Sequence, residues 1–82
     1  MPTSKKIFQE IMSGSKDQNI RFSELQKLLD DLNFHCRIKG DHFIYYKNEI
    51  DEIINIQPNG NKAKAYQVKQ IRNLILKYKM EV

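Results

Sequence analysis

A histidine with basic neighbours near the middle of the chain is the feature best suited to chemistry. His42 follows the Gly40–Asp41 pair, and Arg37 and Lys39 come shortly before it. An imidazole changes its charge near neutral pH and can act as a general base or a general acid. Lysine and arginine donate charge-assisted hydrogen bonds to phosphate oxygens. These residue types indicate metal-free chemistry at a phosphodiester, provided that the fold brings them together.

A β-hairpin is predicted to bring them together. Apolar and polar side chains alternate on both sides of the Gly40–Asp41 pair, and glycine can supply the positive φ of a two-residue turn. With these two residues in the turn, Lys39 lies opposite His42 and Arg37 lies on the diagonal. Cross-strand neighbours are about 4.5–5.5 Å apart and diagonal neighbours about 7–8 Å, distances that suit one phosphate.

A third strand over residues 52–57 extends this sheet. We expect Tyr46 to lie opposite Asp51, a register that places Asn55 beside His42 on the side away from Lys39. Cleavage of RNA without metal needs a base for the 2′-hydroxyl, an acid for the leaving oxygen and donors for the developing charge. In this hypothesis His42 is the base or the acid. The alternative is an ordinary surface histidine.

The other elements provide a core for one face of the sheet. Helical periodicity predicts three helices, over residues 4–12, 23–32 and 65–79. The strand alternation predicts a row of core side chains on the sheet, namely Phe34, Cys36, Ile38, Phe43, Tyr45, Ile54 and Ile56. The element order predicts one α+β domain over residues 1–82, with residues 1–20 as an N-terminal helix and loop.

Basic charge is concentrated in the last third of the chain. Residues 53–80 contain six lysine or arginine residues and no acidic one, whereas the chain up to Glu52 has eight basic and nine acidic residues. Such a one-sided segment favours a polyanionic partner, with RNA or DNA first, although a solvated helix face would show the same pattern. Lys62 and Lys64, just before the last helix, are the candidate phosphate contacts.

Several classes of protein do not fit the composition. Cys36 is the only cysteine, so no internal disulfide forms, and a reducing cytoplasm is expected. His35, Cys36 and His42 lack the spacing of a zinc site. No apolar run reaches the ~18 residues of a membrane span, and no secretory leader is expected. We expect a cytoplasmic protein without metal or other cofactor.

The ordered motifs resemble the HicA family of toxins. Residues 28–34 are similar to the leucine-rich helix of that family and the Gly-Phe-like step that ends it. Residues 39–45 are similar to its strand that opens with Gly-Ser-His or Gly-Thr-His. Residues 53–58 and the Gln-Val-Lys-Gln-Ile-Arg helix after them resemble a longer subgroup. The similarity covers about residues 22–79.

This resemblance implies an α-β-β-β-α fold like the double-stranded-RNA-binding domain, with an extra N-terminal helix. It also implies a ribonuclease toxin that cleaves mRNA without metal, with His42 as the catalytic residue and Gly40 at the family's glycine. The implied partner is a HicB-like antitoxin that covers the active site, and DNA is contacted only through that antitoxin. Asp41 and Asn33 depart from the family, where Ser or Thr and Gly are usual.

Two functions remain open on the sequence. The first is the ribonuclease, with Arg37, Lys39 and Asn55 holding the phosphate. The second is a noncatalytic RNA-binding module of the same fold, in which Lys62 and the residues near it grip phosphates. Asp41 is ambiguous in the first, because a carboxylate there would repel the phosphate, orient the imidazole or act as an acid.

Overall fold

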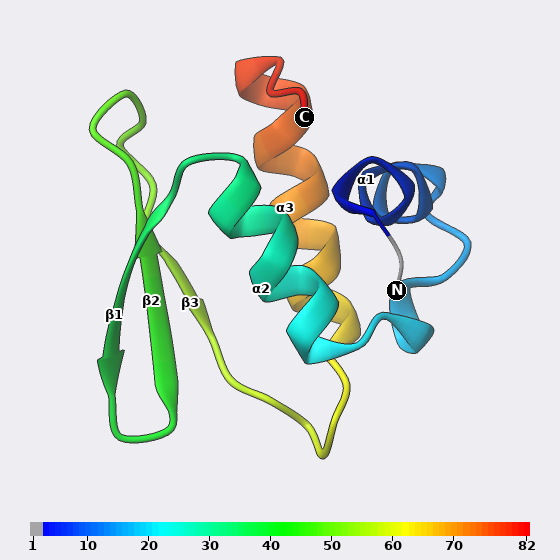
Figure 1. Cartoon of the computed structure of the whole chain (residues 1–82), viewed down its shortest axis with the longest axis horizontal. Coiled ribbons are helices and arrows are strands. Elements are labelled where there is room, and N and C mark those ends of the chain that lie inside the picture. Colours follow the sequence, from blue (N-terminus) through cyan, green and yellow to red (C-terminus); the bar gives the residue numbers. More distant parts are fainter. Residues whose placement is uncertain (1–2) are drawn as a thin grey trace.

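Three helices and a three-stranded antiparallel sheet make up residues 3–82, the part of the chain that this computed structural model describes (Figure 1). The elements are α1 (Ser4–Ser13), a 3₁₀ turn η1 (Asp17–Asn19), α2 (Phe22–Asp31), β1 (His35–Lys39), β2 (His42–Tyr46), β3 (Ile54–Ile56) and α3 (Ala65–Tyr78). The predicted α+β order is confirmed. Residues 1 and 2 of the predicted N-terminal extension lie outside the described residues. Within residues 3–82, no helix is long and apolar enough to cross a membrane.

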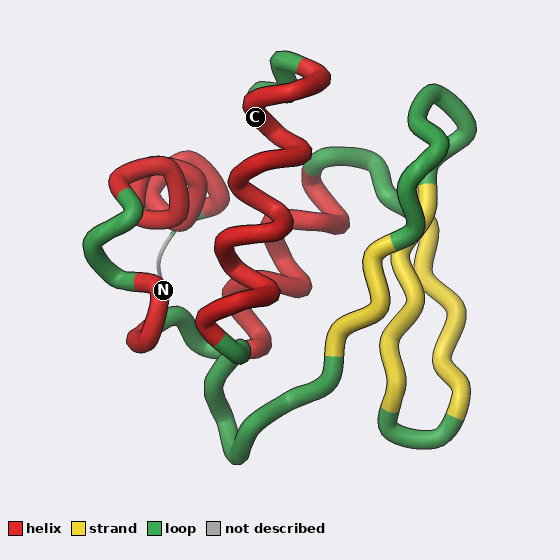
Figure 2. Tube along the Cα trace, turned by 180° about the vertical axis from the view of Figure 1, so that it is seen from behind, coloured by secondary structure: helices red, strands yellow, loops and turns green. Residues whose placement is uncertain are grey.

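The elements form layers with the sheet on one side and α1 on the other. α2 and α3 lie between them, and the two views agree on this arrangement (Figures 1 and 2). The helices bury apolar side chains at helical spacing against the sheet. The fully buried side chains that fill the space between the layers are Ile7, Ile11, Ile20, Leu25, Leu28, Leu29, Tyr45, Ile54, Ile56, Val68 and Ile71.

The predicted core is wrong for β1. Cys36 and Ile38 were expected to be buried, yet every residue of β1 is exposed, and Ile38 is 65% exposed. Ile38 pairs with Phe43, which pairs with Ile56, and Ile56 is 0% exposed. β1 is the edge strand farthest from the helices (Figure 2). The apolar–polar alternation therefore predicted correctly which face of the sheet points to the helices. The helices, however, cover only the β2–β3 part of that face.

The register between β2 and β3 also differs from the prediction. Ile44 lies opposite Asn55 and Tyr45 lies opposite Ile54, a shift of two residues. The connection is longer than expected because Ile50 within it is buried in the core. Because a shift of two residues preserves the face of every side chain, Ile54 still points into the core.

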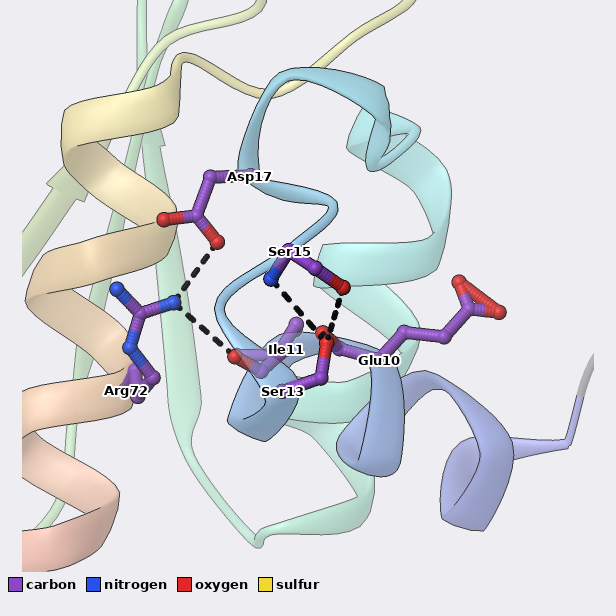
Figure 3. A network of polar contacts seen from close by, with 6 residues as sticks. All are labelled: Glu10, Ile11, Ser13, Ser15, Asp17 and Arg72. Atoms are coloured by element: carbon purple, nitrogen blue, oxygen red, sulfur yellow. Dashed lines mark hydrogen bonds and ion pairs between the residues drawn. The ribbon is translucent and has the colours of Figure 1, made fainter.

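α1 is held to α3 by a half-buried polar contact (Figure 3). Nη1 of Arg72 in α3 donates a hydrogen bond to the carbonyl of Ile11 at 3.1 Å and another to Oδ1 of Asp17 at 2.8 Å. α1 ends at Gly14, whose φ of 73° turns the chain back towards η1. The clamp thus joins the end of α1, η1 and the middle of α3.

The loop between β3 and α3 is paired with the start of α2. The amide of Phe22 donates to the carbonyl of Asn61 at 3.0 Å, and Ala63 donates to the carbonyl of Ile20 at 2.9 Å. Lys62 Nζ donates to Asn19 Oδ1 at 3.2 Å. These contacts hold the basic loop in one position beside α3.

A carboxylate joins the C-terminal end of α3 to the segment that precedes β3. Glu52 accepts hydrogen bonds from Lys77 Nζ at 2.7 Å and from the hydroxyl of Tyr78. The bond from Lys77, followed by that from Tyr78, lowers the pKa of Glu52 to about 2. The carboxylate is therefore ionised through the neutral range, and α3 is attached to the sheet segment at both ends.

Ile56 and Ile38 offer a matched test of how far the helices cover the sheet. Ile56→Ala should lower the free energy of unfolding by about 2–5 kcal/mol, because it opens a cavity in the core. Ile38→Ala, in the same cross-strand row, should cost less than about 1 kcal/mol, because it removes an exposed side chain. Urea unfolding measures both. Equal losses would show that β1 is covered in solution.

Candidate functional site around His42

His42 opens β2 on the face of the sheet away from the helices. Its imidazole is 47% exposed, and Nδ1 lies 3.1 Å from Oδ1 of Asn55. An amide oxygen can only accept a hydrogen bond, so Nδ1 is the donor in this contact, and in the neutral ring Nε2 then keeps its lone pair. Asn55 is diagonal to His42 rather than beside it as predicted, and its side chain spans the difference. The hydrogen bond thus holds the ring in one orientation, in which Nε2 is the acceptor when the imidazole is neutral.

Asp41, next to His42 in the chain, faces the second ring nitrogen. Its Oδ1 lies 3.7 Å from His42 Nε2, and its Oδ2 accepts a hydrogen bond from Gln57 Nε2 at 2.7 Å. The Gln57 bond is the main cause that lowers the pKa of Asp41, followed by its own backbone amide, with smaller effects of His42 and Lys64. An ionised Asp41 at neutral pH favours orientation of the imidazole over the role of acid.

The buried side chain of Gln67 contacts the backbone of the residues that carry this site. Gln67 is 3% exposed, although it is polar. Its Nε2 donates to the carbonyl of Asn55 at 3.3 Å, and its Oε1 accepts from the amide of Gln57 at 3.5 Å. Both backbone groups lie on the free edge of the sheet. Gln67 therefore satisfies that edge and ties the first turn of α3 to the site.

A shallow depression of about 250 Å³ lies at this position. It is lined by His42 and four further residues, namely Asn55, Gln57, Tyr66 and Gln67. The sequence did not identify the last three. Continuing the β2–β3 register by one residue sets Gln57 opposite His42, a signal that the correct register would have revealed. Tyr66 and Gln67 come from α3, and no local pattern joins them to the hairpin.

The other predicted residues are only partly brought together. Lys39 lies opposite His42, as predicted. Arg37 lies opposite Ile44, also as predicted, but its guanidinium sits 5.9 Å from the ring centre of Tyr46, towards the far end of β2. An aromatic face attracts the guanidinium, so this contact turns Arg37 away from the imidazole.

Gly40 and the two lysines of the loop occupy separate places. Gly40 has a φ of 64°, and an added Cβ would meet no atom within 4 Å, so its role is to form the turn. Lys62 and Lys64 line a second depression of about 480 Å³ at the start of α3. Tyr66 lines both depressions. The two lysines are therefore neighbours of the His42 site and not part of it.

Among residues 3–82, no group of three or more histidine, cysteine or acidic side chains is placed to hold a metal ion. Cys36 is a free thiol at the surface of β1. The groups available for chemistry around His42 are thus an oriented imidazole, a carboxylate, amides and nearby ammonium groups.

Comparison with known proteins adds no relative. No protein-family model matches the chain, and neither a curated protein nor a solved structure matches it.

Gln67 can be tested against a nearby residue of the same type. Gln67→Leu should lower the free energy of unfolding by about 1–3 kcal/mol, because two backbone groups at the sheet edge lose their partner. Gln70→Leu, at an exposed position one turn later, should change it by less than about 0.5 kcal/mol. Chemical denaturation compares them. The assignment is wrong if the two variants are equally stable.

Proposed function

We propose that the protein is a metal-independent endoribonuclease of the toxin type, in which His42 is the catalytic residue. The observation that carries the proposal is the hydrogen bond from His42 Nδ1 to Asn55, which in the neutral ring leaves Nε2 as the acceptor on an exposed face. This orientation is what a general base for a ribose 2′-hydroxyl needs. The basic residues on one side of the site supply the attraction for an RNA backbone.

The proposed reaction is transfer of the phosphodiester to the neighbouring 2′-oxygen. His42 Nε2 takes the proton of the 2′-hydroxyl, the 2′-oxygen forms a bond to phosphorus, and the bond from phosphorus to the 5′-oxygen breaks. The leaving 5′-oxygen takes up a proton from water, the imidazolium releases its proton to the solvent, and the products are a 2′,3′-cyclic phosphate and a 5′-hydroxyl. Asp41, 3.7 Å from Nε2, pairs with the imidazolium that forms.

Charge on the phosphoryl oxygens needs donors close to His42. Lys39 is directly across the hairpin and is the ammonium best placed in the register. Preorganised donors of this kind stabilise the charge that develops in the transition state. Asp41 opposes the approach of the phosphate, but its negative charge is shared with the amide of Gln57. In this proposal Arg37 adds to the positive electrostatic potential around the site and does not contact the scissile phosphate.

The resemblance to HicA toxins extends the proposal to fold and partner. We propose that α2, the three strands and α3 correspond to the α-β-β-β-α fold of double-stranded-RNA-binding domains, with α1 as the added helix. A HicB-like antitoxin would cover the His42 face and contact DNA in place of this chain. The proposed site of action is the cytoplasm, where mRNA is translated.

The catalytic role of His42 is tested by its substitution. His42→Ala should slow RNA cleavage by on the order of 10²–10⁴ and abolish toxicity, because a general acid–base group is lost. The fold should survive, since the side chain is half exposed. His35→Ala is the matched control, because His35 is the other histidine, is exposed and lies against Tyr46 at the far end of the hairpin.

The alternative function gives a different result in the same assay. A noncatalytic RNA-binding module would bind RNA without cleaving it, and neither substitution would change a cleavage rate. Cleavage that persists in a folded His42→Ala protein would also exclude the proposed mechanism, and a loss in both variants would point to a general effect on the sheet.

A further prediction concerns the identity of the attacking nucleophile and the independence of cleavage from metal ions. Cleavage should continue in EDTA, because the described residues offer no cluster of metal ligands. Replacing the ribose at the scissile nucleotide by deoxyribose should abolish cleavage at that bond, because the 2′-oxygen is the attacking atom. Gel analysis and mass spectrometry of the products measure both. Loss of activity on chelation, with recovery in Mg²⁺, would contradict the mechanism.

A further inference from the structure

Tyr66 is an aromatic side chain that the proposed mechanism does not use. It is 65% exposed, and among residues 3–82 it is the only phenylalanine or tyrosine that is exposed rather than buried or half-buried. A single exposed ring is ordinary on a protein surface, so the position of Tyr66 and not its exposure alone carries the argument. It stands in the first turn of α3, on the side where the basic loop approaches the His42 site.

The ring is held in place by the buried network. Gln67 Nε2 donates to the hydroxyl of Tyr66 at 3.4 Å, and Gln67 is itself bonded to the edge of β3. This contact restrains the hydroxyl end of Tyr66, while most of the residue stays exposed. A rigid aromatic side chain loses little conformational entropy when it binds. Tyr66 therefore offers a preformed flat surface.

The position of Tyr66 joins two surfaces of different chemistry. On one side is the 250 Å³ depression with His42, and on the other is the 480 Å³ depression with Lys62 and Lys64. Lys62 is held in place by Asn19. An RNA strand that places one phosphate at His42 and a neighbouring phosphate at the lysines passes over the tyrosine ring.

We propose that Tyr66 is a stacking platform for one unpaired nucleobase next to the scissile phosphate. The ligand class is a single-stranded RNA segment, because a base within a duplex has no free face to offer. The inference rests on the proposed function for the identity of the substrate. Since every base has a π-face, the platform accepts all four bases, and it acts by positioning the strand and not by taking part in the chemistry.

The test is a binding measurement that does not depend on cleavage. A short single-stranded RNA with 2′-O-methyl ribose throughout cannot be cleaved, and its fluorescence anisotropy reports binding. Tyr66→Ala should weaken binding roughly 5- to 150-fold, the range of base–aromatic stacking. Tyr66→Phe keeps the ring and should bind within about twofold of the unchanged protein.

Two controls separate stacking from other effects. Leu76→Ala removes an exposed side chain from the same helix, in the groove that α3 shares with α1, and should leave binding unchanged. An oligonucleotide with one abasic nucleotide, moved along the strand, should at a single position reproduce the loss. At that position the abasic change and Tyr66→Ala should not add, because both remove the same contact.

The outcomes distinguish this inference from the proposed function. Unchanged binding by Tyr66→Ala, with cleavage still dependent on His42, would overturn the stacking platform and leave the ribonuclease intact. Equal losses in Tyr66→Phe and Tyr66→Ala would also overturn it, because the hydroxyl and not the ring would then be responsible. Binding that depends on Tyr66, in a protein that cleaves no RNA, would support the platform and contradict the catalytic proposal.

Discussion

The side chain of Gln67 occupies the place that a further strand would take beside β3. It accepts from one backbone amide and donates to one backbone carbonyl of that strand, while it lies buried beneath the surface. A free sheet edge next to a helix must find partners for these groups, since buried backbone groups without them are costly. The same contact brings Tyr66 beside His42, so a requirement of folding also determines which residues share the site.

The part of the site formed by β1 and β2 is determined by their short hairpin turn. Because only two residues form the turn, Lys39 and His42 face each other. Asn55 then orients the imidazole through a single hydrogen bond. Asp41 is the unusual member, a carboxylate beside a site proposed for phosphate. Its bond to Gln57 keeps it ionised and directs it to the ring nitrogen, where it can balance the charge that His42 gains during the reaction.

The basic loop before α3 is anchored by backbone and side-chain hydrogen bonds. Its backbone pairs with the residues that lead into α2, and Lys62 is bonded to Asn19. The Arg72 clamp holds the end of α1 and η1 against α3, so the N-terminal helix stabilises the layer on which the loop lies. The lysines are therefore presented from a preorganised surface, which lowers the cost of binding a flexible polyanion.

The sequence by itself determined the features that depend on neighbouring residues. The helices follow from 3.6-residue periodicity, and the Gly40–Asp41 turn fixes the first hairpin register, because both are local. Tertiary structure decided the features that need distant segments. The burial of Ile50 shifted the β2–β3 register, and the extent of the helices left Ile38 exposed. The contact of Gln67 with β3 joins residues 10 and 12 positions apart, and only the packing of α3 against the sheet edge could assign Tyr66 to the site.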